Sequence, residues 1–311
     1  MENLGFSFNG IDGTSLRVNG WLPEGDIKAS VEIAHGMAEH GARYERLAKF
    51  LNAAGYAVYA IDHRGHGKSV PSDKTHGHMA DKDGWSMAVE ELYLLNQEIK
   101  ARHPGRAVFL LGHSMGSFMV QDYLARFPDS ITGAALSATN GPPGTLGKLG
   151  QLVSRIEKLR AGNEGHSTLL ANMSFKAFNK AFAPNRTEFD WLSRDETEVD
   201  KYVEDPFCGF ECSIATWIGL LDALTRIAAD EAVAKMDPEK PLYLFAGTAD
   251  PVGENAKGVK RLLKVYEKHG FQKVTSKFYE DGRHELLNDT IREEVMQDLL
   301  NWLDQTLEEE S

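Results

Sequence analysis

Three polar side chains, far apart in the sequence, have the chemistry needed to cleave an acyl bond. Ser114 lies in the stretch GHSMG (residues 112–116), Asp250 in GTADPVG and His284 in DGRHE. A serine hydroxyl is a weak nucleophile until a base accepts its proton, and a carboxylate must orient that base. The chain order serine, acid, histidine is typical of such a triad when the serine lies between a strand and a helix. We therefore predict Ser114, Asp250 and His284 as catalytic.

The histidine is chosen from the three that follow Ser114 in the chain, at positions 166, 269 and 284. His166 falls in a helical stretch outside the strand–helix alternation. His269 comes at an expected helix end, where a cation complements the helix dipole, so we assign it a structural role. His284 follows the last expected strand in a turn and is the best candidate for the base.

The acid must follow the strand before that histidine. Asp250 does so, and Pro251 and Gly253 favour a turn there. A plain Asx-turn before proline is the alternative interpretation of Asp250. Asp281, three residues before the histidine, is more typical of turn chemistry.

A tetrahedral intermediate also needs hydrogen-bond donors for its oxyanion. The backbone N–H of Met115, next to the serine, is one candidate. The second is Met37 N–H in AHGMAEHG, where Gly36 lets the backbone turn toward the pocket. Losing one such donor typically costs about 3–4 kcal/mol of transition-state stabilisation.

The elements around the serine must hold it in a sharp turn. Residues 107–113 (AVFLLGH) read as a buried strand and residues 114–128 as an amphipathic helix. Glycines two residues before and after the serine remove the Cβ atoms that would clash there. The serine then lies at the carboxyl edge of the sheet and at a helix N-terminus, which favours an oxyanion.

Strands and helices alternate on both sides of a helical stretch. We expect an α/β fold, with a mostly parallel central sheet and helices on both faces, built from residues 1–140 and 233–311. Residues 141–232 are predicted to form an inserted helical cap. Glycines at 141, 144, 147 and 150 have the composition of a hinge.

Apolar stripes run along the predicted cap helices. We expect most of them to pack onto the core and some to line a channel for an acyl chain. The cap is also the expected place of any transient contact with a membrane surface.

Composition excludes several classes of partner. The 311 residues carry a net charge of −12, which disfavours nucleic acid and gives no attraction to anionic membranes. No obligate protein partner is implied. The N-terminus does not read as a secretory signal, and Cys208 and Cys212, four residues apart, could share one helix face as reduced thiols. We expect a cytoplasmic protein.

Two further patterns resemble ligand-binding motifs but fail in detail. HRGHGKS (63–69) would need glycine at position 62 to be a phosphate loop, and Asp62 stands there. His35, Glu39 and His40 have a spacing that matches neither zinc-protease order. We expect no metal and no cofactor.

Five segments, HGMAEHGARY, DHRGHGKS, GHSMG, GTADPVG and DGRHE, occur in the order and context of one family. The chain resembles the monoacylglycerol lipase and lysophospholipase branch of the serine α/β-hydrolases over most of both core halves. One departure is Ser117, where many relatives carry a second glycine. A general likeness in the cap extends only around FDWLSRD (189–195).

The resemblance implies an α/β-hydrolase fold with a cap over the active site, and ester hydrolysis of acylglycerols or similar lipids without a cofactor. It implies the same triad and the same oxyanion donors. It also implies that Gly36, Glu39, Arg43 and His113 lie at the substrate, near its glycerol end. Alternatives are a lysophospholipase, a short-chain carboxylesterase, a serine peptidase, since related aminopeptidases share the fold, and a catalytically silent binding protein.

Overall fold

The computed structural model describes residues 4–310, apart from the side chains of residues 145 and 146, and has one central eight-stranded sheet. The strand order is β1-β2-β4-β3-β5-β6-β7-β8. The β1–β2 and β2–β4 pairs are antiparallel and every other pair is parallel. The strands are β1 Phe6–Asn9, β2 Ser15–Trp21, β3 Ala29–Ala34, β4 Tyr56–Ile61, β5 Val108–His113, β6 Gly133–Ser137, β7 Leu242–Gly247 and β8 Val274–Tyr279.

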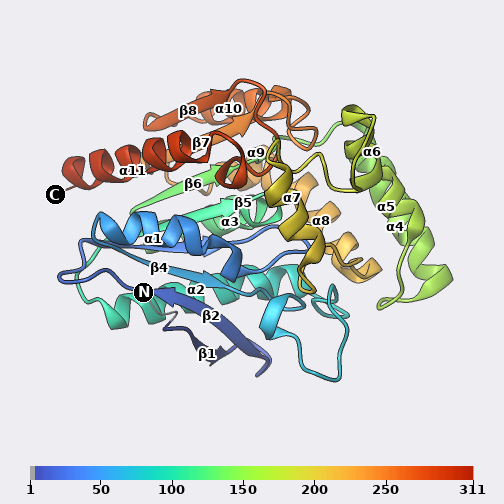
Figure 1. Ribbon diagram of the computed structural model, residues 1–311, viewed down its shortest axis with the longest axis horizontal. Helices are drawn as coiled ribbons and strands as arrows, with labels where there is room; N and C mark the ends of the chain where they lie inside the picture. The colour runs from blue at the N-terminus through green and yellow to red at the C-terminus, as the bar shows by residue number, and fades with distance from the viewer. Residues whose placement is uncertain (1–3, 311) are drawn as a thin grey trace.

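Helices cover both faces of this sheet (Figure 1). α1 (Glu45–Ala53) and α11 (Arg292–Glu309) pack on one face, and α2 (Gly84–Arg102), α3 (Met115–Arg126) and α10 (Lys257–Lys268) on the other. β3, β4, β5, β6 and β7 are buried along their whole length, as expected for parallel strands covered on both faces. The expected fold class is confirmed. Short 3₁₀ turns lie at Gly41–Tyr44, Gly67–Ser69, Pro128–Ser130, Lys180–Phe182 and Leu286–Asn288.

The chain between β6 and β7 is helical and lies at one end of the molecule, on the right in Figure 1. We call residues 141–232 the cap, and their separation as a unit remains our prediction. The helices of this stretch are α4 Thr145–Ala161, α5 Thr168–Met173, α6 Phe175–Asn179, α7 Glu196–Glu204, α8 Ile214–Ile227 and α9 Asp230–Val233.

Two expectations for this stretch are wrong. Gly147 and Gly150 lie inside α4, because an amphipathic pattern continues through them, so the hinge-like composition does not form a loop there. Cys208 and Cys212 share no helix face, because both lie in the connection between α7 and α8.

Most of the apolar side chains of α4 and α5 do not pack onto the core as expected, although Leu170 is buried in it and Val153 packs against it. Leu152 is 57% exposed, Ile156 55% and Leu159 90%. α4 rests on α8, and α5 contacts α4 and α6, so only one side of each helix is covered. The exposed apolar side chains of the two helices are Leu149, Leu152, Ile156, Leu159, Leu169 and Met173.

The turn from β5 to α3 leaves no room for side chains at its glycines. A Cβ atom on Gly116 would overlap the carbonyl group of Ala34 in β3, because α3 crosses that strand closely. A Cβ on Gly112 would meet the backbone of residues 116 and 117. The glycines flanking the serine therefore allow α3 to pack against the sheet.

We predict that Gly116→Ala lowers the free energy of unfolding by about 1–3 kcal/mol, because the backbone of β3 must move to make room. Gly20→Ala in β2 is a matched control, since its Cβ would lie 3.4 Å from the Tyr59 ring, an ordinary contact distance. Denaturant titration of both variants measures the effect. Equal stability of the two variants would contradict this account.

Candidate active site

Ser114 occupies a strained backbone position at the carboxyl end of β5. Its φ is 51° and its ψ is −118°, in a region that non-glycine residues rarely adopt. Strain of this kind costs on the order of 1–3 kcal/mol and persists only where the surroundings impose it. Here the Ser114 N–H donates to the Ser137 carbonyl at 3.0 Å, which holds the turn against β6.

His284 and Asp250 form a buried pair on neighbouring loops. His284 Nδ1 lies 2.9 Å from Asp250 Oδ1, and the side chains are 3% and 0% exposed. Asp250 Oδ1 also accepts the Val252 N–H at 2.9 Å, which orients the carboxylate. Because the carboxylate faces Nδ1, the proton of the neutral imidazole belongs on that atom, and Nε2 is left as the proton acceptor.

Two opposing effects act on the basicity of His284. Burial lowers its pKa, but the charge of Asp250 and the hydrogen bond to it outweigh burial, and the pKa lies above its ordinary value of 6.5. A base with a raised pKa accepts a proton more readily from a hydroxyl group.

One cavity contains both Ser114 and His284. Glu39, His113 and Glu285 contribute polar groups to its lining, and Met37 together with aromatic and aliphatic side chains of the cap contributes the apolar part. The structure therefore brings the predicted nucleophile and the predicted base to a common space under the cap. The apolar lining consists of Met37, Phe175, Phe189, Trp191, Leu192 and Tyr202.

The loop that carries Met37 is fixed by side chains on either side of it. His35 Nε2 accepts the His63 N–H at 3.0 Å, so His35 Nδ1 carries the proton and donates to the Gly36 carbonyl at 2.7 Å. Glu39 Oε1 accepts the Gly36 N–H at 2.6 Å. Both polar groups of Gly36 are thus held, and this sets the direction of the peptide that bears the Met37 N–H.

The segments that carry the two predicted oxyanion donors lie next to the serine. A Cβ on Gly36 would lie 3.4 Å from Cβ of Ser114, so the loop passes directly beside the serine. Met115 is the first residue of α3, and its N–H has no acceptor within the helix.

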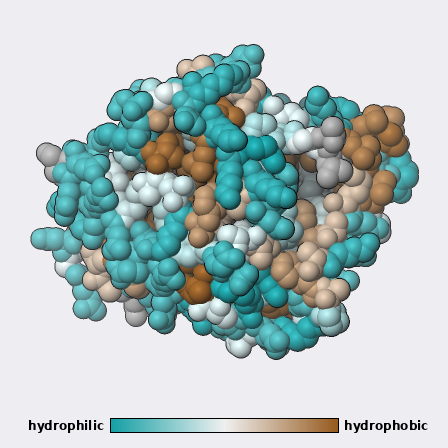
Figure 2. Space-filling model, turned by 90° about the horizontal axis from the view of Figure 1, so that it is seen from above, coloured by the Kyte–Doolittle hydropathy of each residue, from teal (hydrophilic) through white to brown (hydrophobic). Residues whose placement is uncertain are grey.

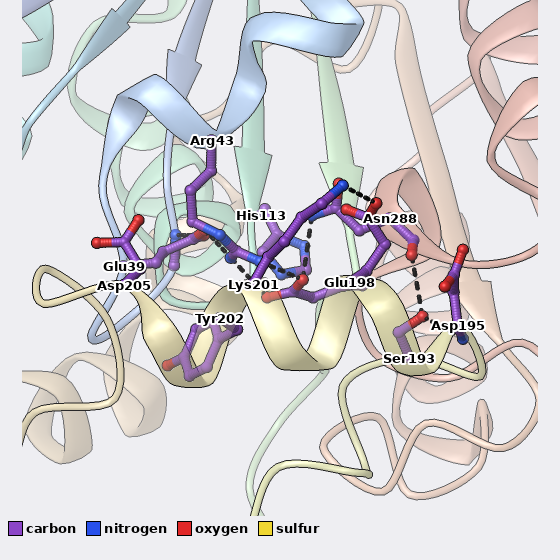
Figure 3. A network of polar contacts seen from close by, with 12 residues as sticks. Glu39, Arg43, His113, Ser193, Asp195, Glu198, Lys201, Tyr202, Asp205 and Asn288 are labelled. Carbon is purple, nitrogen blue, oxygen red and sulfur yellow. Dashed lines mark hydrogen bonds and ion pairs between the residues drawn. The ribbon is translucent and has the colours of Figure 1, made fainter.

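Arg43 lies between two carboxylates beside this cavity (Figure 3). Its guanidinium donates to Glu39 at 2.5 Å and in a bidentate manner to Glu285 at 2.7 Å. The Tyr202 ring of α7 packs on the guanidinium, 4.9 Å from its centroid. Tyr44 donates to Glu39 at 3.0 Å. One cation and two anions leave a net negative charge at this wall.

Electrostatics keep Glu285 and Arg43 ionised despite their burial. Burial alone would raise the pKa of Glu285, but Arg43 lowers it to about 2. Burial opposes the charge of Arg43, and the two carboxylates nonetheless raise its pKa well above the ordinary value. His113 differs: burial, and then the charge of His284, lower its pKa to about 4, so it stays neutral.

His113 connects the serine turn to the base. Its ring centroid lies 4.9 Å from that of His284, and its Nδ1 lies 3.1 Å from Ser137 Oγ. It lines the cavity together with Glu39 and Glu285. All four residues predicted at the glycerol end thus lie around this cavity or, for Arg43, directly behind its wall.

A cap segment that we call the strap, residues 190–195, is bonded to the loop of His284. The Glu285 N–H donates to the Leu192 carbonyl at 2.7 Å, and the His284 N–H to the Trp191 carbonyl at 3.4 Å. The Trp191 ring lies 4.9 Å from the His284 ring. The base is therefore held on one side by the cap itself.

Ion pairs extend the strap's contacts beyond His284. Arg194 binds the fully buried Asp289 at 2.7 Å, and Arg292 binds Asp195 at 2.8 Å. Ser193 Oγ donates to the Asn288 carbonyl at 2.9 Å (Figure 3). These contacts join residues about 95 apart in the sequence. They fix the strap to the loop that carries His284.

Sequence reasoning missed the partners of the predicted residues. Glu285 could have been noticed, because an acid directly follows the candidate base. Trp191 and Leu192 gave no signal of pairing with residues 284–285, since backbone hydrogen bonds leave no trace in side-chain type. Asp62, which excluded a phosphate loop, instead accepts the Gly41 N–H at 2.8 Å and so fixes the loop of Arg43.

Other predicted positions have different surroundings. His269 caps α10 and pairs with Asp230 at 2.9 Å, in agreement with a structural role. His166 is exposed in the cap. Of the residues in the rejected zinc pattern, His35 and Glu39 hold the oxyanion loop.

None of the helices within residues 4–310 has the length and apolar character that a membrane crossing requires.

Comparison with protein families matches residues 25–291 to the family described as serine aminopeptidase, S33 (Hydrolase_4). The chain belongs to this family. It is a serine hydrolase of the α/β type, and the resemblance seen in its motifs is confirmed.

Relatives of this S33 member align over nearly its whole length. It is 29% identical to human monoglyceride lipase, over 94% of this chain and 88% of that protein. It is 29% identical to the monoacylglycerol lipase of Mycolicibacterium smegmatis, over 96% and 95%. The crystal structure of a carboxyl esterase from Bacillus coagulans, in complex with glycerol, superposes with a TM-score of 0.90 at 27% identity, over 99% of each chain.

We predict a pH profile set by His284. Because its pKa lies above 6.5 and only the neutral form can accept a proton, kcat/KM should fall as pH drops through that raised pKa. Asp250→Asn should move this acid limb to lower pH, since the charge that raises the pKa is gone, and should reduce kcat about 10⁴-fold.

Asp281→Asn is the matched control for this pH profile. Asp281 is an exposed acid in the turn before His284, with a left-handed φ of 55° that asparagine tolerates. Its variant should keep the wild-type profile. An acid limb that stays in place in the Asp250 variant would rule out the pair as the source of the pKa.

Proposed function

We propose that this S33-family hydrolase cleaves monoacylglycerols, with Ser114, Asp250 and His284 as its triad. The observation that carries the proposal is the cavity at Ser114, to which the core contributes polar side chains and the cap aromatic ones. A monoacylglycerol has the same division, with a hydroxylated alcohol on one side of the ester and a hydrocarbon chain on the other.

In the first half-reaction Ser114 Oγ attacks the ester carbonyl while His284 Nε2 accepts its proton. The tetrahedral oxyanion is stabilised by the N–H groups of Met37 and Met115. When the C–O bond to glycerol breaks, His284 returns the proton to the leaving oxygen. Glycerol departs, and the acyl group stays on Ser114 as an ester.

In the second half-reaction water replaces glycerol. His284 accepts a proton from the water as its oxygen attacks the acyl carbonyl, and the same N–H groups hold the second oxyanion. Collapse breaks the bond to Ser114, and the proton passes from His284 to the serine oxygen. The products are a fatty acid and the free enzyme.

The polar wall suits the free hydroxyls of the alcohol. Glu39 and Glu285 offer carboxylate oxygens as acceptors, and the neutral His113 can donate or accept. Since Arg43 is the single cation between two carboxylates, the wall keeps a negative charge. This charge disfavours the phosphate of a lysophospholipid and supports the neutral glycerol headgroup.

The apolar wall gives the acyl chain a direction. Phe175 and Phe189 line the cavity at Ser114 and also a second one that contains Ala171, Phe210 and Trp217. The two rings therefore lie between the cavity at Ser114 and a space within the cap, whose lining also includes Lys176, Glu188 and Glu211. A shift of these rings joins the spaces, and each methylene buried there contributes about 0.8 kcal/mol.

A substrate panel tests the proposal. We expect monoacylglycerols to be hydrolysed with a kcat/KM at least about 10-fold above lysophospholipids, aminoacyl anilides and acetyl esters, because only they satisfy both walls. Ser114→Ala should lose this activity and also lose labelling by a fluorophosphonate, since both need the serine oxygen.

The same panel separates the alternatives. If the enzyme prefers a lysophospholipid, a short-chain ester or an aminoacyl anilide, the proposed substrate class is wrong. The serine mechanism would still hold. Binding of monoacylglycerol by the wild type with neither turnover nor labelling would instead indicate a silent binding protein. Activity retained in Ser114→Ala would overturn the assigned nucleophile.

We further propose that the exposed face of α4 and α5 contacts the lipid surface from which the substrate comes. Hydrophobic side chains gather at the right-hand end of the molecule in Figure 2, where these helices lie in Figure 1. α4 carries Lys148, Arg155, Lys158 and Arg160 against Glu157 alone, although the whole chain is acidic. An amphipathic, locally basic helix suits an anionic lipid interface.

Leu159→Glu should weaken binding to vesicles of phosphatidylcholine and phosphatidylserine about 10-fold or more, because burying a leucine contributes about 1.5–3 kcal/mol. Its kcat/KM on a water-soluble ester should stay unchanged. Ile11→Glu, at an exposed site in the β1–β2 turn, is the matched control. Vesicle sedimentation measures the binding, and an equal loss in both variants would contradict the assignment to α4.

A further inference from the structure

Three side chains of different types converge where the cap meets the loop after β3. His40 follows the oxyanion loop, and Asp205 and Cys208 follow α7. Their ligating atoms all lie within 4.8 Å of one another. His40 Nε2 lies 2.9 Å from Asp205 Oδ2. None of these three residues lines the cavity at Ser114, and none takes part in the proposed reaction.

From this cluster we infer a binding site for a thiophilic divalent cation of the Zn²⁺ class, with His40, Asp205 and Cys208 as ligands. Imidazole, carboxylate and thiolate are the side-chain ligands of protein zinc sites. Tetrahedral Zn²⁺ with bonds of about 2.0–2.3 Å holds its ligand atoms about 3.3–3.8 Å apart. To close on the ion, the His40–Asp205 pair at 2.9 Å must widen slightly and the other ligand atoms, within 4.8 Å, must approach, and solvent supplies the fourth ligand.

The charges of the site balance. When the Cys208 thiol gives its proton to solvent and bonds the ion through sulfur, the thiolate and Asp205 together cancel two positive charges. This neutrality matters because the charge of Arg43 acts on Cys208, and a cationic site would be repelled by it. A site of thiolate and imidazole also disfavours Mg²⁺ and Ca²⁺, which prefer oxygen ligands.

Hydrogen bonds already orient the ligands. Asp205 Oδ1 accepts the Phe207 N–H at 2.8 Å, which leaves Oδ2 for the ion. The Cys208 N–H donates to the Asp205 carbonyl at 3.0 Å, so the two ligands share one tight turn. The His40 side chain is only 11% exposed and packs edge-on against the Phe207 ring. Such supporting contacts orient the ligands of known metal sites.

An ion at this position would join the cap to the oxyanion loop. The Gly209 N–H and the Tyr202 hydroxyl already donate to the Ala38 carbonyl, at 3.0 and 2.9 Å. His40 follows Ala38 by two residues. Metal bonds from His40 to the α7–α8 connection would therefore strengthen an existing contact between the two parts.

Cobalt titration of the reduced, full-length protein tests the site. Co²⁺ occupies tetrahedral zinc sites, and its bond to a thiolate gives an intense near-ultraviolet charge-transfer band. We expect this band at a 1:1 ratio in the wild type and its loss on addition of Zn²⁺. Cys208→Ala should abolish it, and His40→Gln and Asp205→Asn should each weaken Co²⁺ binding at least about 10-fold.

Cys212→Ala is the matched control, because Cys212 is buried four residues further on and is no member of the cluster. His78→Gln controls for a second group, His78, Asp81 and Glu164, which has no sulfur ligand. Both controls should keep the band. A wild type without the band, or a band that survives in Cys208→Ala, would overturn the site.

A measurement on the wild type alone guards against misfolded variants. Zn²⁺ should slow iodoacetamide alkylation of Cys208 at least about 10-fold, as located by mass spectrometry, because the bound sulfur is no longer a free nucleophile. Mg²⁺ should give no protection. Equal alkylation of Cys208 with and without Zn²⁺ would refute the proposal independently of any substitution.

Discussion

The guanidinium of Arg43 contacts three segments that are distant in the sequence. It binds Glu39 in the loop of the predicted oxyanion donor, Glu285 next to the predicted base, and the face of Tyr202 in the cap. A buried ion pair offsets its desolvation cost only when its geometry is good, and removing one partner typically costs about 3–5 kcal/mol. The relative positions of the oxyanion loop, the base and α7 therefore depend on this one cation.

The cap has two parts that differ in how firmly they are bound to the core. Residues 190–195 are bonded to the loop of His284 through their backbone and through Arg194 and Asp289. α4 instead rests on α8, α5 contacts α4 and α6, and the two helices leave an apolar face exposed. An element with many buried hydrogen bonds opens at a high free-energy cost, whereas a weakly covered one opens more easily. Access for a lipid is therefore expected on the side of α4 to α6, with the base held in place.

The strain at Ser114 and the position of Met37 have the same origin in close packing. Gly116 lets α3 approach β3, and that approach places the serine beside Gly36. His35 and Glu39 then fix both polar groups of Gly36. The predicted donors are thus fixed before any substrate arrives, and preorganisation of this kind makes N–H groups effective for a developing charge.

The sequence by itself determined the alternation of strands and helices, the glycine-flanked serine turn and the identity of Asp250 and His284 as a pair. The first two features are local, because periodicity and glycine positions are properties of short segments, and the third follows from the order of the motifs along the chain. Only the tertiary structure decided that the strap pairs with the His284 loop, that Arg43 lies between Glu39 and Glu285, and that the apolar stripe of α4 faces outward. Contacts between residues 90 to 240 apart depend on how the sheet and the cap pack in space, and no single segment encodes that packing.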